Sequence, residues 1–190
     1  MKIPFSRTIK QWVWSRTGQS FVMHKGWIFS RNNLFWSEIP EWERFYLPID
    51  VDGLAVLDVG AGEGETAKFF LEHGASKVIC IESDNMAFRL LKINARERPI
   101  FALYKRFELA DLDMNFDFMK MDIEGYEEVL LQTRLTKPSV LEVHGLQLRD
   151  KFEKQGWNIK YKVPSSRREA SPLCYAYKNI PMHRKNGNTK

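Results

Sequence analysis

Cysteine is scarce in this sequence, with only Cys80 and Cys174 among 190 residues. Each lies in an apolar run typical of a β-strand, and the two are far apart along the chain. Neither belongs to a metal-binding or redox motif. We therefore expect two reduced thiols packed in the interior of the fold.

Long apolar runs are absent as well. No stretch approaches the ~18 uninterrupted apolar residues that a membrane-spanning helix requires. The N-terminal stretch MKIPFSRTIKQWVWSRTGQ is basic, but it lacks the apolar core of roughly 7–15 residues found in a secretory signal. These absences predict a cytoplasmic protein that does not engage a membrane.

The charge that is present is unevenly distributed. Residues 1–37 hold six Lys/Arg and no acid, and residues 151–190 hold ten Lys/Arg against two acids. Since the net charge of the whole chain is +5, residues 38–150 carry −9. An acidic middle between two basic ends bears on binding partners more than on the fold.

Strand and helix patterns alternate from residue 53 onward. The sequence predicts strands at 54–60, 77–83, 116–122, 139–145, 157–163 and 173–178, and helices at 64–74, 83–98, 124–135 and 146–156. The segment 100–115 indicates one short strand near IFALY and then a loop. Strands that alternate with helices are typical of an α/β fold with a parallel sheet.

The first 50 residues differ from the rest because they are rich in aromatic side chains. Residues 20–31 favour a strand pair, and residues 36–47 favour a short helix. We interpret residues 1–50 as an N-terminal cap on the substrate side, 51–180 as the main domain, and 181–190 as a flexible basic tail.

A glycine-rich turn follows the first regular strand. The stretch VLDVGAGEGET ends the strand with Asp58 and opens the next helix with Gly60, Gly62 and Gly64. Glycines at such a turn permit close approach of a ligand, and the helix start offers unpaired N–H groups. A P-loop would require Gly-Lys-Ser/Thr, and a dinucleotide fingerprint would require glycine where Glu65 stands.

The turn instead resembles the first motif of class I S-adenosylmethionine-dependent methyltransferases. That resemblance implies a Rossmann-like, doubly wound, mostly parallel seven-stranded sheet with S-adenosyl-L-methionine as cofactor. Gly60 and Gly62 would face its methionine part, Asp58 would bind near its amino group, and Glu82 would hold the ribose. The alternative is that the glycines only form a tight turn while Glu82 caps the following helix.

An acid after the third strand commonly contacts the adenine amino group in this fold. By the same resemblance, Asp111 or Asp113 would have this role, and the alternative for either residue is an ordinary loop acid. The resemblance to class I methyltransferases rests on the order of these features along the chain: glycine turn, helix, strand and terminal acid.

A second cluster of acids lies in FDFMKMDIEGYEEVLL, residues 116–131. The carboxyl ends of strands line the ligand crevice of a doubly wound sheet, so Asp122 is directed at the site. KMDIEGYEEVLL and SVLEVHG together resemble the FkbM family of methyltransferases. The matching positions are Lys120, Asp122, Glu124, Gly125, Glu127, Glu142 and His144.

The FkbM-like resemblance implies transfer of a methyl group to a hydroxyl oxygen of a small molecule or a sugar. Asp122 or His144 is the candidate base, with Glu142 or Glu124 orienting the histidine. Glu127 and Glu128 are interpreted as ordinary first-turn helix acids. We expect no metal; the alternative is a divalent ion at Asp122, Glu142 and His144, as in catechol-type enzymes.

Two other function classes remain open at this stage. An RNA methyltransferase would use the basic, aromatic segments RTIKQWVWSR and PSSRREASP, since cations and aromatic platforms bind RNA. The Asn/Asp/Ser-Pro-Pro-aromatic motif of base-modifying enzymes is absent, because DIEG stands in its place. A non-catalytic module that keeps the cofactor fold is the third class.

Overall fold

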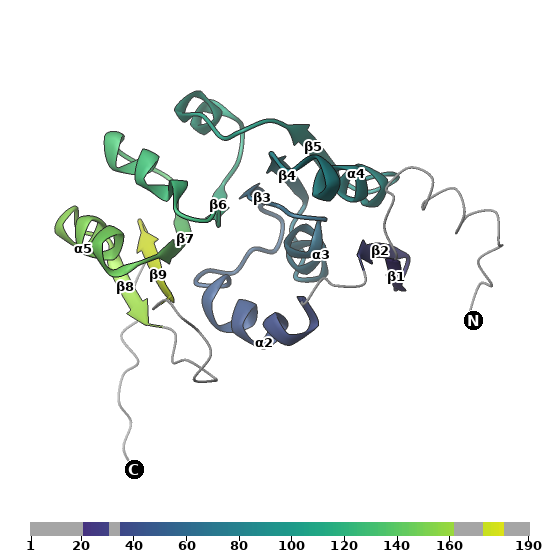
Figure 1. Cartoon of the computed structure of the whole chain (residues 1–190), viewed down its shortest axis with the longest axis horizontal. Coiled ribbons are helices and arrows are strands. Elements are labelled where there is room, and N and C mark those ends of the chain that lie inside the picture. The colour runs from purple at the N-terminus through teal and green to yellow at the C-terminus, as the bar shows by residue number, and fades with distance from the viewer. Residues whose placement is uncertain (1–20, 31–34, 162–172, 181–190) are drawn as a thin grey trace, which may run out of the picture.

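The computed structural model describes residues 21–30, 35–161 and 173–180 (Figure 1). The N-terminal segment contains strands β1 (Phe21–His24) and β2 (Trp27–Ser30) and helix α2 (Phe35–Phe45). The regular pattern then gives β3 (Ala55–Val59), α3 (Glu65–Glu72), β4 (Lys77–Glu82), α4 (Asn85–Asn94) and β5 (Ile100–Tyr104). It continues with the 3₁₀ helix η1 (Leu109–Asp113), β6 (Phe118–Met121), the 3₁₀ helix η2 (Tyr126–Gln132), β7 (Ser139–His144), α5 (Leu146–Lys154), β8 (Asn158–Tyr161) and β9 (Leu173–Lys178).

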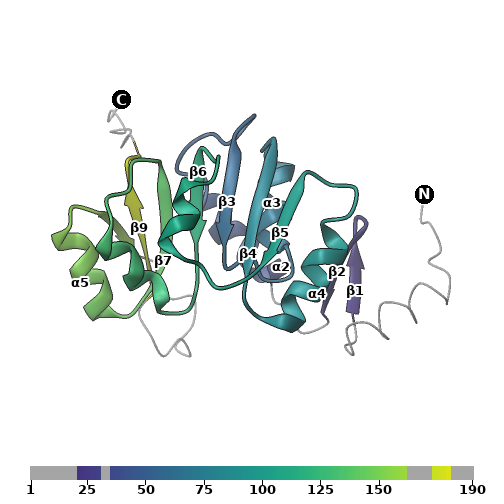
Figure 2. The same ribbon diagram turned by 90° about the horizontal axis from the view of Figure 1, so that it is seen from above.

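One seven-stranded sheet organises the molecule, in the order β5-β4-β3-β6-β7-β9-β8 (Figure 2). β9 pairs antiparallel with β7 and with β8, while the pairs among β3 to β7 are all parallel. The predicted α/β fold with a mostly parallel seven-stranded sheet is therefore confirmed. The strand order reverses between β3 and β6, and this reversal opens a crevice at the carboxyl ends of those two strands.

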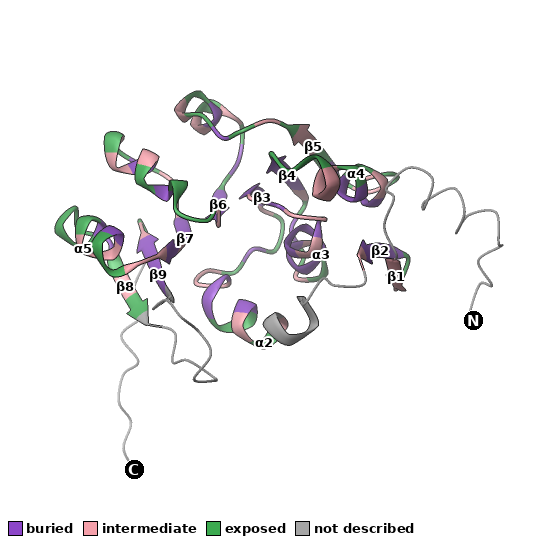
Figure 3. Cartoon of the chain, in the orientation of Figure 1, coloured by how far each residue is buried: buried purple, intermediate pink, exposed green. Residues whose placement is uncertain are grey.

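Alternate residues of the central strands pack into two separate cores. Val56 of β3 and Phe118 of β6 belong to a core that also contains residues of α2 and α3. Leu57 and Met119, their sequence neighbours, belong to the core on the opposite face, which includes α5 and η2. Both faces of the strands are buried (Figure 3), and this explains why the strands appear in the sequence as continuous apolar runs.

The described part of the N-terminal segment packs into the first of these cores. Trp42 and Phe45 of α2 are buried beside the sheet, and the Phe45 ring stacks on Tyr175 of β9 with centroids 4.2 Å apart. The side-chain amide of Asn94 in α4 bonds both the N–H and the carbonyl of Ile28 in β2. The predicted strand pair and short helix are confirmed, whereas the domain boundaries at 50 and 180 stay predictions.

Two features of the chain bear on the earlier expectations. Cys80 and Cys174 are buried free thiols, as the sequence predicted. Within the described ranges, no helix has the length and apolarity needed to span a lipid bilayer. The tail 181–190 and the segments RTIKQWVWSR and PSSRREASP lie outside the described residues.

Close contact between the glycine turn and the end of β6 generates a stability prediction. A β-carbon at Gly60 would lie 1.8 Å from the carbonyl oxygen of Asp122, whereas one at Gly53 would meet nothing within 4 Å. Both glycines have positive φ, 74° and 73°. We expect Gly53→Ala to cost about 1–2 kcal/mol through φ alone. Gly60→Ala should cost a further 1–3 kcal/mol, roughly, or more.

Urea denaturation of both variants measures this difference directly. Equal losses in the two proteins would show that β6 does not approach the turn as closely as the structure has it.

Candidate cofactor and acceptor site

A cavity of about 330 Å³ lies at the carboxyl ends of β3, β4 and β6. It is lined by Val59, Gly60, Ile81, Glu82, Ser83, Lys105, Phe107, Asp122, Ile123 and Glu124. A second cavity of about 280 Å³ shares Ser83, Phe107 and Ile123 with the first and adds Arg106 and Tyr126. Three of the predicted site residues that line the first cavity, Gly60, Glu82 and Asp122, come from three different strand ends.

The glycine turn is held in place by backbone hydrogen bonds. The N–H of Gly60 donates to the Ile81 carbonyl at 2.9 Å, and the N–H of Gly64 donates to Ala61 at 2.9 Å. Gly60, Gly62 and Gly64 all have positive φ. The turn therefore has the conformation that glycine favours, with Gly60 facing the cavity.

Glu82 joins the turn to the next helix and also faces the cavity. Its Oε2 accepts the N–H of Gly62 at 2.8 Å, and its Oε1 accepts the N–H of Asp84 at 2.6 Å. Asp84 in turn caps α4 by accepting the N–H groups of Met86 and Ala87. Glu82 thus makes hydrogen bonds that hold the glycine turn and the start of α4, as the alternative of a purely structural role would require. It also lines the place where a ribose would lie.

Asp58 is placed behind the turn rather than in the cavity. It is fully buried, forms an ion pair with Lys120 at 3.1 Å, and accepts the Thr66 hydroxyl at 2.5 Å. Lys120 also donates to the Gly60 carbonyl at 2.9 Å. Burial would lower the pKa of Lys120, but Asp58 and Asp122 raise it above its usual value, so the ammonium stays charged.

Asp111 also lies outside the cavity lining. It is buried in η1, where it accepts the Lys105 ammonium at 2.9 Å and the N–H of Glu108 at 2.9 Å. Lys105 does line the cavity, so Asp111 is connected to it through that side chain. Sequence reasoning did not single out Lys105 or Phe107, because nothing in 100–115 distinguishes a lining residue from a loop residue.

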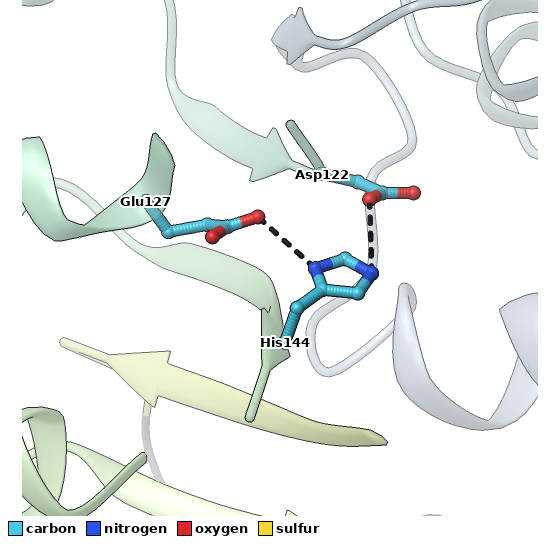
Figure 4. Close-up of side chains that lie close together, drawn as sticks. All are labelled: Asp122, Glu127 and His144. Atoms are coloured by element: carbon cyan, nitrogen blue, oxygen red, sulfur yellow. Dashed lines mark hydrogen bonds and ion pairs between the residues drawn. The ribbon is translucent and has the colours of Figure 1, made fainter. Parts of the chain in front are cut away.

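His144 lies between the carboxylates of Asp122 and Glu127 (Figure 4). Its Nδ1 is 3.2 Å from Oε1 of Glu127, and its Nε2 is 3.9 Å from Oδ1 of Asp122 and 3.6 Å from Oε2 of Glu124. The hydrogen bond to Glu127 raises the pKa of His144 to about 9; burial opposes this, and Asp122 adds to it. The imidazole is therefore cationic at neutral pH.

Glu127 corrects one sequence-based interpretation. It was expected to be an ordinary first-turn helix acid, but its side chain is fully buried and accepts the N–H groups of Ile123 and Gly125. Burial would raise its pKa, yet the hydrogen bonds from His144 and the backbone hold that pKa below its usual value. Glu128 does behave as expected, since it is exposed and pairs with Lys151.

Glu142 does not orient His144 by hydrogen bonding. Its Oε2 instead accepts the hydroxyl of Tyr46 at 2.6 Å. Burial and the charge of Asp122 together raise the pKa of Glu142 to about 7, against the opposing hydrogen bond from Tyr46. Tyr46 directly follows α2, and the sequence holds no local signal for a partnership across 96 positions.

The fold and the cavity together define a class. The structure has the class I S-adenosylmethionine-dependent methyltransferase fold, as the similarity to solved structures shows. The ribosomal protein L11 methylase of Lactobacillus delbrueckii subsp. bulgaricus superposes with a TM-score of 0.54 at 20% identity, covering 76% of this chain and 78% of that one.

Sequence relatives point to the same class. The ribosomal protein L11 methyltransferase of Thermotoga neapolitana is 30% identical over 118 residues, covering 56% of this chain and 45% of that protein. The histone-arginine methyltransferase CARMER of Drosophila mojavensis is 34% identical over 103 residues, covering 51% of this chain and 19% of that protein. The chain thus spans less than half the length of these relatives. No family model matches the chain, so the FkbM-like resemblance stays a prediction.

The contact between Glu127 and His144 generates a titration prediction. The pKa of His144 is about 9 against an ordinary 6.5. A raised pKa means that the protonated ring stabilises the fold fully below about pH 6.5, and that this contribution is lost as pH rises toward 9. We expect Glu127→Gln to lower the pKa of His144 by about one unit or more, because the charged acceptor is removed.

NMR of the ring proton in EDTA-treated protein measures the pKa. Glu128→Gln, at the neighbouring exposed position, is the matched control and should leave it unchanged. If the pKa of His144 were unaltered in Glu127→Gln, the contact with Glu127 would not be the cause of its raised pKa.

Proposed function

We propose that this chain is an S-adenosylmethionine-dependent methyltransferase. The observation that carries the proposal is the cavity at the switch point between β3 and β6, with Gly60 on one side and Glu82 on the other. S-adenosyl-L-methionine is the expected cofactor of this fold. The names of the two relatives described above, both methyltransferases, support the same reaction type.

Each part of that cofactor can be assigned to a different group of cavity residues. Glu82 would accept the two ribose hydroxyls, and the turn at Gly60 and Gly62 would adjoin the methionine part. Phe107 and Ile123 offer apolar surface to the adenine ring in the space shared by the two cavities. Asp58 would act through Lys120 and the Gly60 carbonyl, and Asp111 through Lys105.

Asp122 is our choice for the base. It lines the cavity beside Gly60, whereas His144 is not among the lining residues and lies next to Asp122 and Glu124. In a direct displacement, the acceptor oxygen would attack the methyl carbon while the sulfonium leaves as a neutral thioether. The acceptor proton would pass to the Asp122 carboxylate, with His144 and Glu124 bordering the acceptor.

The second part of the proposal is the class of methyl acceptor, which follows from the FkbM-like resemblance. We propose a hydroxyl of a small molecule or a sugar, handled in the cytoplasm. RNA is the alternative, and the observation favouring it is the charge of +6 on residues 1–37 and +8 on residues 151–190. The two relatives described above, a histone-arginine and a ribosomal protein methyltransferase, add protein side chains as a third class to assay.

Cofactor binding is tested through Glu82. Glu82→Gln keeps a carbonyl oxygen for one backbone N–H but removes the charge that would hold both ribose hydroxyls. We expect the affinity for S-adenosylmethionine to fall about tenfold or more, because hydrogen bonds to charged groups contribute roughly 1.5–3 kcal/mol.

Calorimetry measures the affinity, with Glu128→Gln as control because Glu128 is exposed and outside the cavity lining. Absence of heat with the unaltered protein would instead favour the non-catalytic module.

Methyl transfer is tested through Asp122. We expect Asp122→Asn to bind the cofactor normally but to lose about 10²–10⁴-fold in turnover, because the amide cannot take the acceptor proton. Radiolabelled cofactor offered with hydroxyl compounds, bulk RNA and protein identifies the acceptor class.

RNA labelling that weakens steeply with added salt would replace the hydroxyl proposal by the RNA alternative. Full turnover in Asp122→Asn on any confirmed acceptor would remove Asp122 as the base.

A further inference from the structure

Three side chains beside the cavity each offer a metal-ligand atom within a small volume. The donors are carboxylate oxygens of Asp122 and Glu127 and a ring nitrogen of His144, and they lie within 4.8 Å of one another. They come from the end of β6, from η2 and from the end of β7. Figure 4 shows the imidazole between the two carboxylates, with Glu127 facing one ring nitrogen and Asp122 facing the other. Three elements therefore place donors around one small volume.

Glu127 carries an oxygen that the protein leaves unsatisfied. Its Oε1 accepts the N–H groups of Ile123 and Gly125 and faces Nδ1 of His144. Its Oε2 is buried and has no hydrogen-bond partner anywhere in the described ranges. A buried carboxylate oxygen without a partner is costly, and a bound cation is one of the groups that can satisfy it.

The balance of charge around His144 also favours a cation. Asp122, Glu124 and Glu127 surround a single imidazole, so negative charge remains in excess even when the ring is protonated. The nearby ammonium of Lys120 is already paired with Asp58. Glu142 lies on the other side, bonded to Tyr46.

We propose that Asp122, Glu127 and His144 form a binding site for one divalent transition-metal ion, with Mn²⁺ as the probe. A mixed set of carboxylates and one imidazole suits such an ion better than Ca²⁺, which takes oxygen ligands. Oε1 of Glu127 lies 3.2 Å from Nδ1 of His144, a separation that two ligands of one ion can have, and the ring proton between them would pass to solvent as the ion binds. Asp122 faces the other ring nitrogen, with Oδ1 3.9 Å from Nε2, and its partly exposed side chain would rotate toward Nδ1 to complete the set.

The residues differ from the set weighed from the sequence, because Glu127 takes the place of Glu142. Any part that the ion has in methyl transfer rests on the proposed function: beside the acceptor, it would lower the pKa of a hydroxyl oxygen. Binding of the ion itself does not depend on that function.

The test is a titration of the EDTA-stripped full chain with Mn²⁺, in the absence of S-adenosylmethionine, with free Mn²⁺ followed by electron paramagnetic resonance. We expect saturable binding of one ion per chain, weakened about tenfold or more by Asp122→Asn and by His144→Gln. Glu128→Gln is the matched control, since it removes an exposed acid of the same helix, and it should bind as the unaltered chain does.

Thermal unfolding in the same samples separates ligand loss from misfolding. Mn²⁺ should raise the melting temperature of the unaltered chain and of Glu128→Gln, but not that of His144→Gln. Unsaturable binding, or equal affinity in all four proteins, would overturn the proposal as adventitious surface binding.

Calorimetry with S-adenosylmethionine in EDTA keeps the two proposals apart. Cofactor binding without Mn²⁺ binding removes only the metal site. Mn²⁺ binding without cofactor binding removes only the proposed function.

Discussion

The ion pair between Asp58 and Lys120 is the interaction on which the cofactor side of the site depends. The two residues are paired in register on β3 and β6, and neither side chain is more than 1% exposed. Lys120 extends from this pair to the Gly60 carbonyl, and Asp58 extends to Thr66 in α3. Removing one partner of such a pair leaves a buried charge, which costs about 3–5 kcal/mol. The glycine turn is therefore positioned from behind, by charges that do not face the cavity.

Near Asp122 and His144, the spacing of the acids has a physical explanation in a tight turn. Glu124 and Gly125 both have positive φ, 53° and 96°, as the chain leaves β6 for η2. Such a turn exposes backbone N–H groups that need an acceptor, and the buried carboxylate of Glu127 accepts those of Ile123 and Gly125. The same carboxylate then reaches His144. One acid thus shapes the turn and sets the charge of the histidine beside it.

Periodicity predicted most of the fold because the strands are buried on both faces and the helices begin and end at ordinary signals. Asp84 caps α4, and β4 ends at Glu82. The helix predicted at 124–135 is instead a 3₁₀ helix at Tyr126–Gln132. Its buried residues, Glu127 and Leu130, are three positions apart, which matches the 3₁₀ repeat. Because glutamate is rarely buried, the sequence pattern predicted an exposed side chain for Glu127.

For the candidate site, too, the positions of residues were predictable from the sequence, whereas their side-chain contacts were not. Strand ends could be located from the sequence, so Glu82, Asp122 and His144 were predicted to lie there, and the structure brings the last two together. The partnerships that orient side chains could not be located, because they join distant positions such as Tyr46 and Glu142. Asp58 shows the converse: its place in the motif was clear, but only its contacts with Lys120 and Thr66 show that its side chain lies in the interior.

Tyr46 connects the N-terminal segment to the electrostatics of the site. The segment is anchored by aromatic packing, with Phe45 stacked on Tyr175 and the Phe45 carbonyl accepting the Tyr177 hydroxyl at 3.1 Å. This anchoring holds the Tyr46 hydroxyl against Glu142, whose pKa of about 7 lies close to neutrality. Displacing α2 would free that carboxylate beside Asp122 and Lys120, so the charge at the end of β7 depends on a helix that lines neither cavity.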